Sequence, residues 1–96
     1  MIAQDRTLDV VHNTARHRFE IKLDDQFAVL EYQIRGDLIY FTHTGVPFEH
    51  RGQGVTGNLV AAGLAHAKAE KLKVVPLCSY VDVYIRRNRQ DEPLLA

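Results

Sequence analysis

The sequence has little of what marks a secreted, membrane or nucleic-acid-binding protein. It has one cysteine, Cys78, among 96 residues, so no intramolecular disulfide can form. No segment approaches the roughly 20 consecutive apolar residues that a membrane helix needs. The 12 basic and 12 acidic side chains give a net charge of zero, which argues against an electrostatic nucleic-acid surface. These absences favour a small soluble protein with neither a membrane nor a nucleic-acid partner.

The length and the first residues indicate the organisation and the location. A chain of 96 residues corresponds to one domain. Residues 1–6 lack the apolar run of a signal peptide, and a lone cysteine suits a reducing compartment. We therefore expect a cytoplasmic single domain over residues 1–96, with loose ends at 1–9 and 89–96. Exposed sheet edges in so small a protein are compatible with a monomer or a weak homodimer.

Three runs in the first half of the chain have the pattern of β-strands. In the first run, Phe19, Ile21 and Leu23 alternate with charged residues, as expected where one face of a strand is buried. The later runs are rich in β-branched and aromatic residues, and Asp24–Asp25 and Gly36 predict tight turns between them. The pattern predicts an antiparallel meander of strands at 18–23, 27–34 and 38–46.

The second half predicts a helix, a strand and another helix. Residues 55–71 place Leu59, Ala62, Gly63 and Ala67 on one helical face, and small residues would let this helix lie close to a sheet. A short apolar strand follows at 73–77. The segment 79–82 has the form of a capping box, which predicts a helix from Tyr80 to Arg87 with Ser79 as its N-cap. A strand, a helix and a strand in succession favour parallel pairing, so the fold class is α+β with a mixed sheet.

A glycine-rich loop, Arg51-Gly52-Gln53-Gly54, lies between the third strand and the first helix. Backbone N–H groups and the helix dipole at such a junction can bind an anion, and Arg51 adds a positive charge. The loop lacks the patterns of a P-loop and of a Rossmann fingerprint. A turn that only connects strand to helix is the alternative interpretation.

The residues around this loop resemble a known family. The segment Val46-Pro47-Phe48-Glu49-His50-Arg51-Gly52-Gln53-Gly54-Val55 is similar to the acetyl-CoA-binding motif Q/R-x-x-G-x-G/A of the GNAT acetyltransferase superfamily. The segments 43–47, 75–80 and 84–87 look like the very short GNAT-like family of acetyltransferases. The resemblance covers roughly residues 10–88 and implies a minimal GNAT-like fold.

The resemblance also implies a cofactor and a role for particular residues. It implies acetyl-CoA, with the pyrophosphate bound by Arg51, Gly52, Gln53, Gly54, Val55, Thr56 and Gly57. It implies that Val46 and Phe48, at the end of the third strand, offer backbone groups to the pantetheine arm. Tyr84 matches the tyrosine that protonates the departing thiolate in many GNAT enzymes, a role that needs a hydroxyl near the sulfur.

The sequence departs from the family pattern at two positions. Glu49 stands at the first motif position instead of Gln or Arg, and Gly45 stands where relatives can carry a polar or acidic side chain. The early helices that shape the acceptor site in full GNAT domains are also missing. The function implied is N-acetyl transfer to an amine that the sequence does not name. The alternative is a non-catalytic module that binds acyl-CoA or a protein partner.

Cys78 and His43 are the remaining candidates for chemistry. Cys78 precedes the second helix, and a helix N-terminus lowers a thiol pKa and favours the thiolate. The resemblance implies a cysteine near the acetyl group, so Cys78 could accept this group or contact the thioester. Alternatively, it could be a small buried apolar residue. His43, on the third strand, could reach the sulfur or act as a weak base. The five histidines show no metal-ligand spacing, so we expect no metal site.

Overall fold

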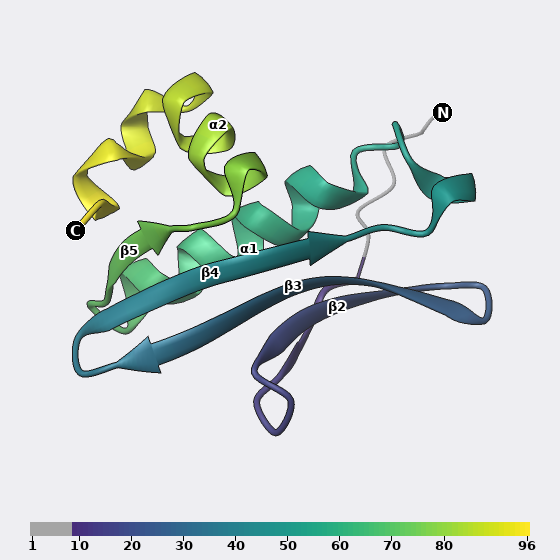
Figure 1. The fold of residues 1–96 in the computed structure, drawn as a ribbon, viewed down its shortest axis with the longest axis horizontal. Coiled ribbons are helices and arrows are strands. Elements are labelled where there is room, and N and C mark those ends of the chain that lie inside the picture. The colour runs from purple at the N-terminus through teal and green to yellow at the C-terminus, as the bar shows by residue number, and fades with distance from the viewer. Residues whose placement is uncertain (1–8) are drawn as a thin grey trace.

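A five-stranded sheet forms the centre of the fold, in the order β1-β2-β3-β4-β5 (Figure 1). The computed structural model describes residues 9–96, so the loose end expected at 1–9 lies outside the described residues except for Asp9. The first four strands pair antiparallel, and β5 pairs parallel with β4. The strands are β1 (Val11–Asn13), β2 (Arg18–Leu23), β3 (Gln26–Arg35), β4 (Leu38–Gly45) and β5 (Lys73–Pro76). This arrangement confirms the predicted α+β fold with a mixed sheet.

The helices connect and cover the strands. Helix α1 joins β4 to β5 and runs along one face of the sheet, while α2 follows β5 and packs beside α1 (Figure 1). Two short 3₁₀ helices complete the chain, one before the glycine loop and one at the C-terminus. The bounds are η1 (Phe48–His50), α1 (Val55–Ala69), α2 (Ser79–Arg87) and η2 (Arg89–Leu94). The helix, strand and helix predicted for the second half of the chain are therefore confirmed.

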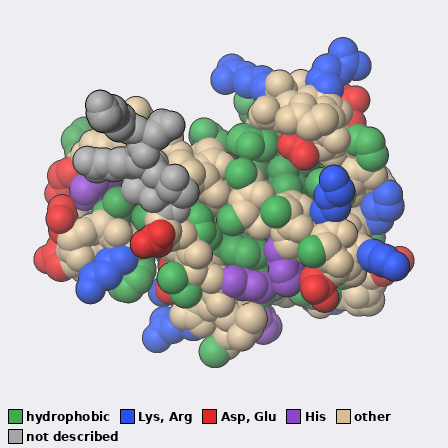
Figure 2. Space-filling view, turned by 180° about the vertical axis from the view of Figure 1, so that it is seen from behind, with side chains coloured by type: hydrophobic (Ala, Val, Ile, Leu, Met, Phe, Trp, Pro, Cys, Tyr) green, Lys and Arg blue, Asp and Glu red, His purple; other side chains and the backbone are tan. Residues whose placement is uncertain are grey.

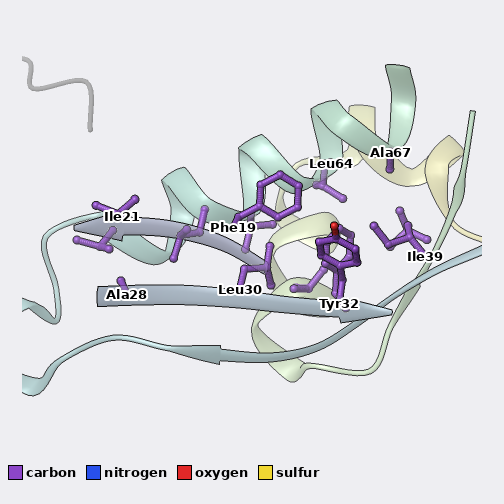
Figure 3. Close-up of a cluster of buried hydrophobic side chains, with 14 of the residues drawn as sticks. Phe19, Ile21, Ala28, Leu30, Tyr32, Ile39, Leu64 and Ala67 are labelled. Atoms are coloured by element: carbon purple, nitrogen blue, oxygen red, sulfur yellow. The ribbon is translucent and has the colours of Figure 1, made fainter. Parts of the chain in front are cut away.

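The core lies between the sheet and α1 (Figure 3). Phe19, Leu30 and Tyr32 point from the sheet toward Leu64 and Ala67 of the helix. A β-carbon built at Gly63 would lie 2.9 Å from side-chain carbons of both Leu30 and Phe41, so only hydrogen fits there. The helical face predicted from the spacing of small residues is the face that packs. The largest fully buried side chains are Phe41, Ile21, Leu30, Ile39, Leu59, Ile85, Val60, Val74 and Val81.

A β-bulge interrupts β4 at Thr42. Glu31 lies opposite His43 and Tyr32 lies opposite Phe41, so Thr42 is an extra residue on the β4 side. The extra residue reverses the alternation of side chains in the rest of the strand. Thr44 therefore lies opposite the buried Leu30, on the side of the sheet that faces α1, and the exposed His43 lies on the other side.

The structure differs from the sequence-based expectation at both ends and at α2. Strand β1 was not predicted. The N-cap of α2 is Cys78, Ser79 is already helical, and no side chain caps this helix, so the predicted capping box is wrong. The C-terminal residues, expected to be loose or only partly packed, are attached to β5. Lys73 Nζ donates to the Pro93 carbonyl at 2.8 Å, and the Ala96 amide donates to the Val74 carbonyl at 2.9 Å.

Candidate functional site

A cleft of about 440 Å³ opens where β4 ends and α1 begins. Its walls come from one nearly continuous stretch, residues 44–56, and from one residue of α2. Thr44–Val46 form the end of β4, His50–Gly52 and Gly54 form the loop, and Val55 and Thr56 begin α1. Tyr80 of α2 closes the remaining side. The cleft therefore brings together most of the residues that the family resemblance singled out, including Val46, Arg51, Gly52, Gly54, Val55 and Thr56.

The N-terminus of α1 is built to receive an anion. Gly54 is the N-cap with φ 76°, and Gly52 has φ 81°, a left-handed backbone that favours glycine. Among residues 9–96 no side chain caps the helix, and its first turn has no acidic residue. The first backbone N–H with a helical partner is that of Asn58, which donates to the Gly54 carbonyl at 3.1 Å. The preceding N–H groups and the positive end of the helix dipole are therefore available at the cleft.

Arg51 lies along the loop that leads into this helix. Its Nε donates to the Val46 carbonyl at 3.4 Å, and its guanidinium carbon lies 5.6 Å from the centre of the Phe48 ring. Phe48 itself is 78% exposed and does not line the cleft. The Phe48 side chain thus supports Arg51 from outside, and Arg51 brings a fixed positive charge to the anion site.

A gap between β4 and β5 continues from the cleft. The parallel pairing of these strands ends at Phe41 and Pro76, and the Cys78 amide then donates to the Phe41 carbonyl at 2.9 Å. Beyond this point Thr42–Gly45 pair with β3 alone among residues 9–96. Their outer edge presents backbone groups to the gap, as an edge strand does to an added strand. An extended ligand with amide groups fits such an edge.

Cys78 lies at the inner end of this gap, against Thr44. The Thr44 Oγ1 and Cys78 Sγ atoms are 3.5 Å apart, and the cysteine is partly buried. Burial alone would raise the pKa of the Cys78 thiol. Hydrogen bonds from the Thr44 hydroxyl and from backbone groups of Val81, Tyr80 and Thr44 outweigh burial, so the pKa is lowered. This environment favours the thiolate form of Cys78. Thr44, which contacts the sulfur, also lines the cleft.

The two tyrosines of α2 lie in different hollows. Tyr80 lines the cleft and is 46% exposed, whereas Tyr84 lies one turn further along and lines a hollow between α1 and η2. Burial raises the pKa of Tyr84, and the nearby charge of Asp91 adds to this rise. Tyr84, the sequence-based candidate, is therefore outside the cleft. Tyr80, the second residue of α2, is the tyrosine that lies at the cleft.

The remaining predicted residues surround the cleft without lining it. His43 lies on the other face of the sheet, where its Nε2 is 3.4 Å from the position of a β-carbon at Gly45. Gln53 lines a separate hollow together with Lys22 and Asp24. Gly57 is in the first turn of α1, where an added β-carbon would have no atom within 4 Å. Open space at this glycine leaves room for a ligand beside the helix.

The sequence-based list also omitted residues that do line the cleft. Thr44 was missed because the bulge that turns it inward leaves no periodic signal. His50 also lines the cleft, and its Nε2 lies 3.6 Å from Asp24 Oδ2 in the β2–β3 turn. Tyr80 could have been found from its position two residues after Cys78.

Within residues 9–96, no three His, Cys, Asp or Glu side chains are arranged to hold a metal ion. None of the helices in this part of the chain is long and apolar enough to cross a membrane.

Comparisons with known proteins agree with this geometry. The chain is similar to the protein NATD1 of Gallus gallus, with 31% identity over 92% of this chain and 83% of the relative. Human NATD1 is 31% identical over 91% of this chain and 80% of its own length. The fold matches the NMR structure of a GCN5-like protein from Staphylococcus aureus, with a TM-score of 0.74 and 26% identity over 94% and 89% of the two chains. Residues 18–94 match the model of the GCN5-related N-acetyltransferases. The chain belongs to the GCN5-related N-acetyltransferase family.

Proposed function

We propose that the protein binds acetyl-CoA in the cleft and transfers the acetyl group to an amine. The observation that carries the proposal is the uncapped, glycine-flanked N-terminus of α1, which opens into a cleft continuous with the gap between β4 and β5. A pyrophosphate suits the first feature and an extended amide-containing arm suits the second. Family membership supports the same ligand at the level of the whole family.

The binding residues follow from this arrangement. Gly52, Gly54 and the backbone of 55–57 would hold the pyrophosphate, with Arg51 as the neutralising charge. Gln53 would take part through its backbone, because its side chain lines another hollow. The backbone of Thr42–Val46 would hold the pantetheine arm, and Phe48 would contribute by supporting Arg51. Each glycine is open on the ligand side, so the residues present fit the cofactor.

The reacting end of the gap contains Cys78, Thr44 and Tyr80. Bound acetyl-CoA supplies an acetyl group already activated as a thioester. Tyr80 lies at the mouth of the gap, and its hydroxyl holds a proton that a departing thiolate requires, so we assign the donor role to Tyr80 rather than Tyr84. Thr44 orients the Cys78 thiolate toward the same region.

Cys78 has two roles compatible with this position. It accepts the acetyl group transiently, or it only contacts the thioester. Intact-mass spectrometry after incubation with acetyl-CoA separates the two, because only the first role produces an acetyl adduct that disappears in Cys78→Ala. An adduct that survives in this variant would exclude the covalent role.

His43 is our candidate base for the acceptor. It lies on the face of the sheet opposite the cleft, beside Gly45, whose lack of a side chain leaves the gap accessible from that face. An amine that arrives there would meet His43 before it meets the reacting carbon. The acceptor and the cofactor would thus approach the gap from opposite faces of the sheet.

The test compares two glycines that share a left-handed backbone. Gly54 (φ 76°) is in the cleft and Gly36 (φ 61°) is in the β3–β4 turn, and an added β-carbon is unobstructed at both. Ligand at 100 times its dissociation constant stabilises a protein by about 2.7 kcal/mol. For a domain of this size, that stabilisation raises the melting temperature by roughly 10 °C or more. We expect acetyl-CoA to raise the melting temperature of the wild type and of Gly36→Glu but not of Gly54→Glu.

The outcomes separate the alternatives. An equal shift in both variants would mean that the loop is only a turn. A shift without acetyl transfer to a panel of amines would favour the non-catalytic acyl-CoA-binding alternative.

A further inference from the structure

A histidine cluster occupies the place where β1 meets α1, at the opposite edge of the sheet from β5. Its members are His12, His66, Phe19 and Tyr32, and histidine side chains are visible on this face in Figure 2. The His12 ring stacks on Phe19, with centroids 4.2 Å apart and planes inclined by 13°. The edge of the His66 ring lies against it at 4.5 Å, and His12 Nε2 is hydrogen bonded to the Tyr32 hydroxyl at 2.6 Å.

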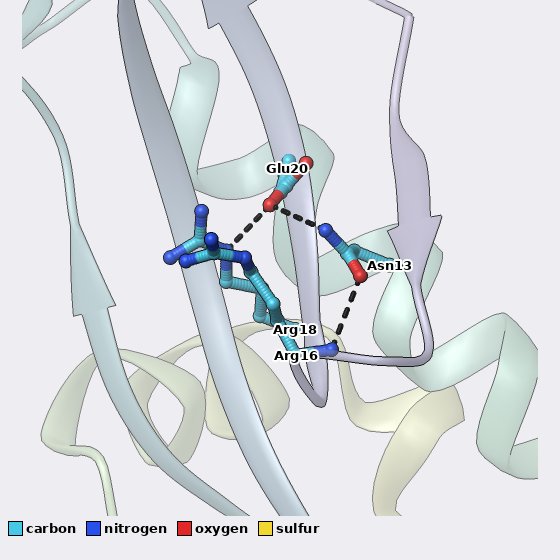
Figure 4. A network of polar contacts seen from close by, with 4 residues as sticks. All are labelled: Asn13, Arg16, Arg18 and Glu20. Atoms are coloured by element: carbon cyan, nitrogen blue, oxygen red, sulfur yellow. Dashed lines mark hydrogen bonds and ion pairs between the residues drawn. The ribbon is translucent and has the colours of Figure 1, made fainter.

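The ring of His12 anchors β1 on the α1 side of the sheet, and Val10, just before the strand, also packs against the core. The strand has three residues, and among residues 9–96 it pairs with β2 alone. Val11 is 58% exposed, so it contributes little packing. On the other face, Asn13 Nδ2 donates to Glu20 Oε2 at 3.1 Å, and Glu20 also accepts from Arg18 (Figure 4). The pairing with β2, the packing of Val10, one polar contact and the ring of His12 therefore hold a strand too short to be stable alone.

In the described part of the chain, the side chains packed against His12 include no carboxylate that could balance a positive charge on its ring. From β2 it meets Phe19, from β3 Tyr32, and from α1 His66. Phe19 and Tyr32 are buried, with 3% and 5% of their surface exposed. Among residues 9–96, no carboxylate oxygen lies within the 4.0 Å ion-pair distance of His12 or His66. His17, in the adjacent turn, stacks at 5.9 Å on the far side of Tyr32 and adds no negative charge.

We infer that the His12–His66 pair is an acid-sensitive latch whose protonation releases β1 from the edge of the sheet. The latch is closed when both imidazoles are neutral, because two neutral rings pack edge to face without electrostatic cost. Protonation of His12 places charge beside the buried rings of Phe19 and Tyr32 and next to a second imidazole. The strand that carries His12 can escape this cost by leaving, whereas His66 is fixed in α1.

The pH range follows from the environment of His12. Burial lowers its pKa below the ordinary value of 6.5, and the charge of His66 lowers it further. The open state, where the ring is solvated, therefore binds protons more readily than the closed state. At pH values above the ordinary histidine pKa of 6.5, the closed state has its full stability. As the pH falls through 6.5 toward the lower pKa of the docked ring, the closed state becomes less stable relative to the open state. Each pKa unit of lowering corresponds to about a tenfold change in the opening equilibrium.

The latch and the cleft are at different places in the fold. Within the described part of the sheet, β1 is adjacent to β2 alone, and the cleft is formed by β4, the glycine loop, α1 and α2. Opening should therefore expose the edge of β2 and the histidine cluster while the cleft keeps its shape. The inference does not depend on the proposed activity.

The test uses the full chain and two NMR measurements. A titration of the ring protons of the five histidines gives the pKa of each, and amide hydrogen exchange, corrected for intrinsic rates, gives local opening. We expect His12 to titrate below the ordinary value. We expect protection of Val11–Asn13 to fall at least several-fold between about pH 7.5 and about pH 5.5, a range that spans the ordinary histidine pKa. Amides of β4 and α1 should keep their protection.

Three variants identify the cause. His12→Phe keeps a ring on Phe19 but cannot titrate, so the pH dependence of β1 opening should vanish. His66→Gln should raise the pKa of His12 and reduce the acid effect. His17→Asn, which tolerates the left-handed φ of 52°, is the matched control and should change neither. Titration of wild-type His12 at or above 6.5, or simultaneous loss of protection in β1 and β4, would overturn the inference.

Discussion

The two halves of β4 differ in their neighbours and in the role of their residues. The closed half, Leu38–Phe41, has strands on both sides and places Ile39 and Phe41 in the core. The open half, Thr42–Gly45, has β3 on one side and the gap on the other. A single extra residue, Thr42, separates them and reverses the direction of the side chains. One strand thus provides both the rigid centre of the fold and the edge of the candidate site, because the bulge ends one pattern of packing and begins another.

The largest expected effect is in the closed half. Phe41→Ala removes a side chain that is 1% exposed and that contacts α1 close to Gly63. The loss of transfer energy and the cavity that remains should lower the free energy of unfolding by about 3–5 kcal/mol. Thr42→Ala, one residue away in the open half, should cost less than about 1 kcal/mol because Thr42 is exposed. Urea unfolding of both variants measures the difference, and equal losses would remove the distinction between the halves.

An intermediate effect is expected at the Thr44–Cys78 contact. Thr44→Val keeps the shape of the side chain but removes the hydroxyl that favours the thiolate. The pKa of Cys78 should rise, so the pH at which iodoacetamide alkylation reaches half its maximal rate should move upward. A hydrogen bond of this kind is worth about 1 kcal/mol, which corresponds to less than one pKa unit. Thr42→Val, on the other face of the strand, is the control, and an identical profile in both variants would show that Thr44 does not influence the thiol.

The smallest expected effect has opposite signs for stability and binding. Gly57→Ala should stabilise α1 by about 0.5–1 kcal/mol, because glycine is a poor helix former and the added methyl meets no atom within 4 Å. The same methyl would occupy the space beside the helix N-terminus and weaken acetyl-CoA binding. Ala65→Gly, exposed on the same helix, should lower stability by a similar amount without changing binding. Thermal unfolding and calorimetric titration measure both quantities, and unchanged affinity in Gly57→Ala would place the phosphates elsewhere.

Most of the fold was predictable because its signals are periodic. Strands β2 and β3 and helix α1 show the spacing expected of half-buried elements, and their bounds are close to the predicted ones. Strand β1 was missed because three residues are too few for alternation to be visible and one of its anchors is a histidine. The start of α2 was wrong because Ser79 and Asp82 have the capping-box spacing while the helix begins without any side-chain cap.

The candidate site was predictable only where it is continuous in sequence. The glycine loop carries its signal in adjacent residues, and the cleft contains Arg51, Gly52 and Gly54 as expected. Thr44 and Tyr80 reach the cleft through a bulge and through the start of a helix, which depend on tertiary structure. The register shift of one residue in β4 cannot be recognised from the amino-acid composition of the strand. It nevertheless determines that Thr44 faces the cleft and that His43 does not.

The uncapped start of α1 also has a consequence for the energetics of the protein alone. A helix without a cap is weakest at its first turn, so fraying should concentrate there. An anion bound at this turn would serve as the missing cap and complete the secondary structure. Ligand affinity and the rigidity of this turn would then be two measures of the same free energy. A substitution that introduces a side-chain cap would make the turn more rigid and would compete with the ligand for the same N–H groups.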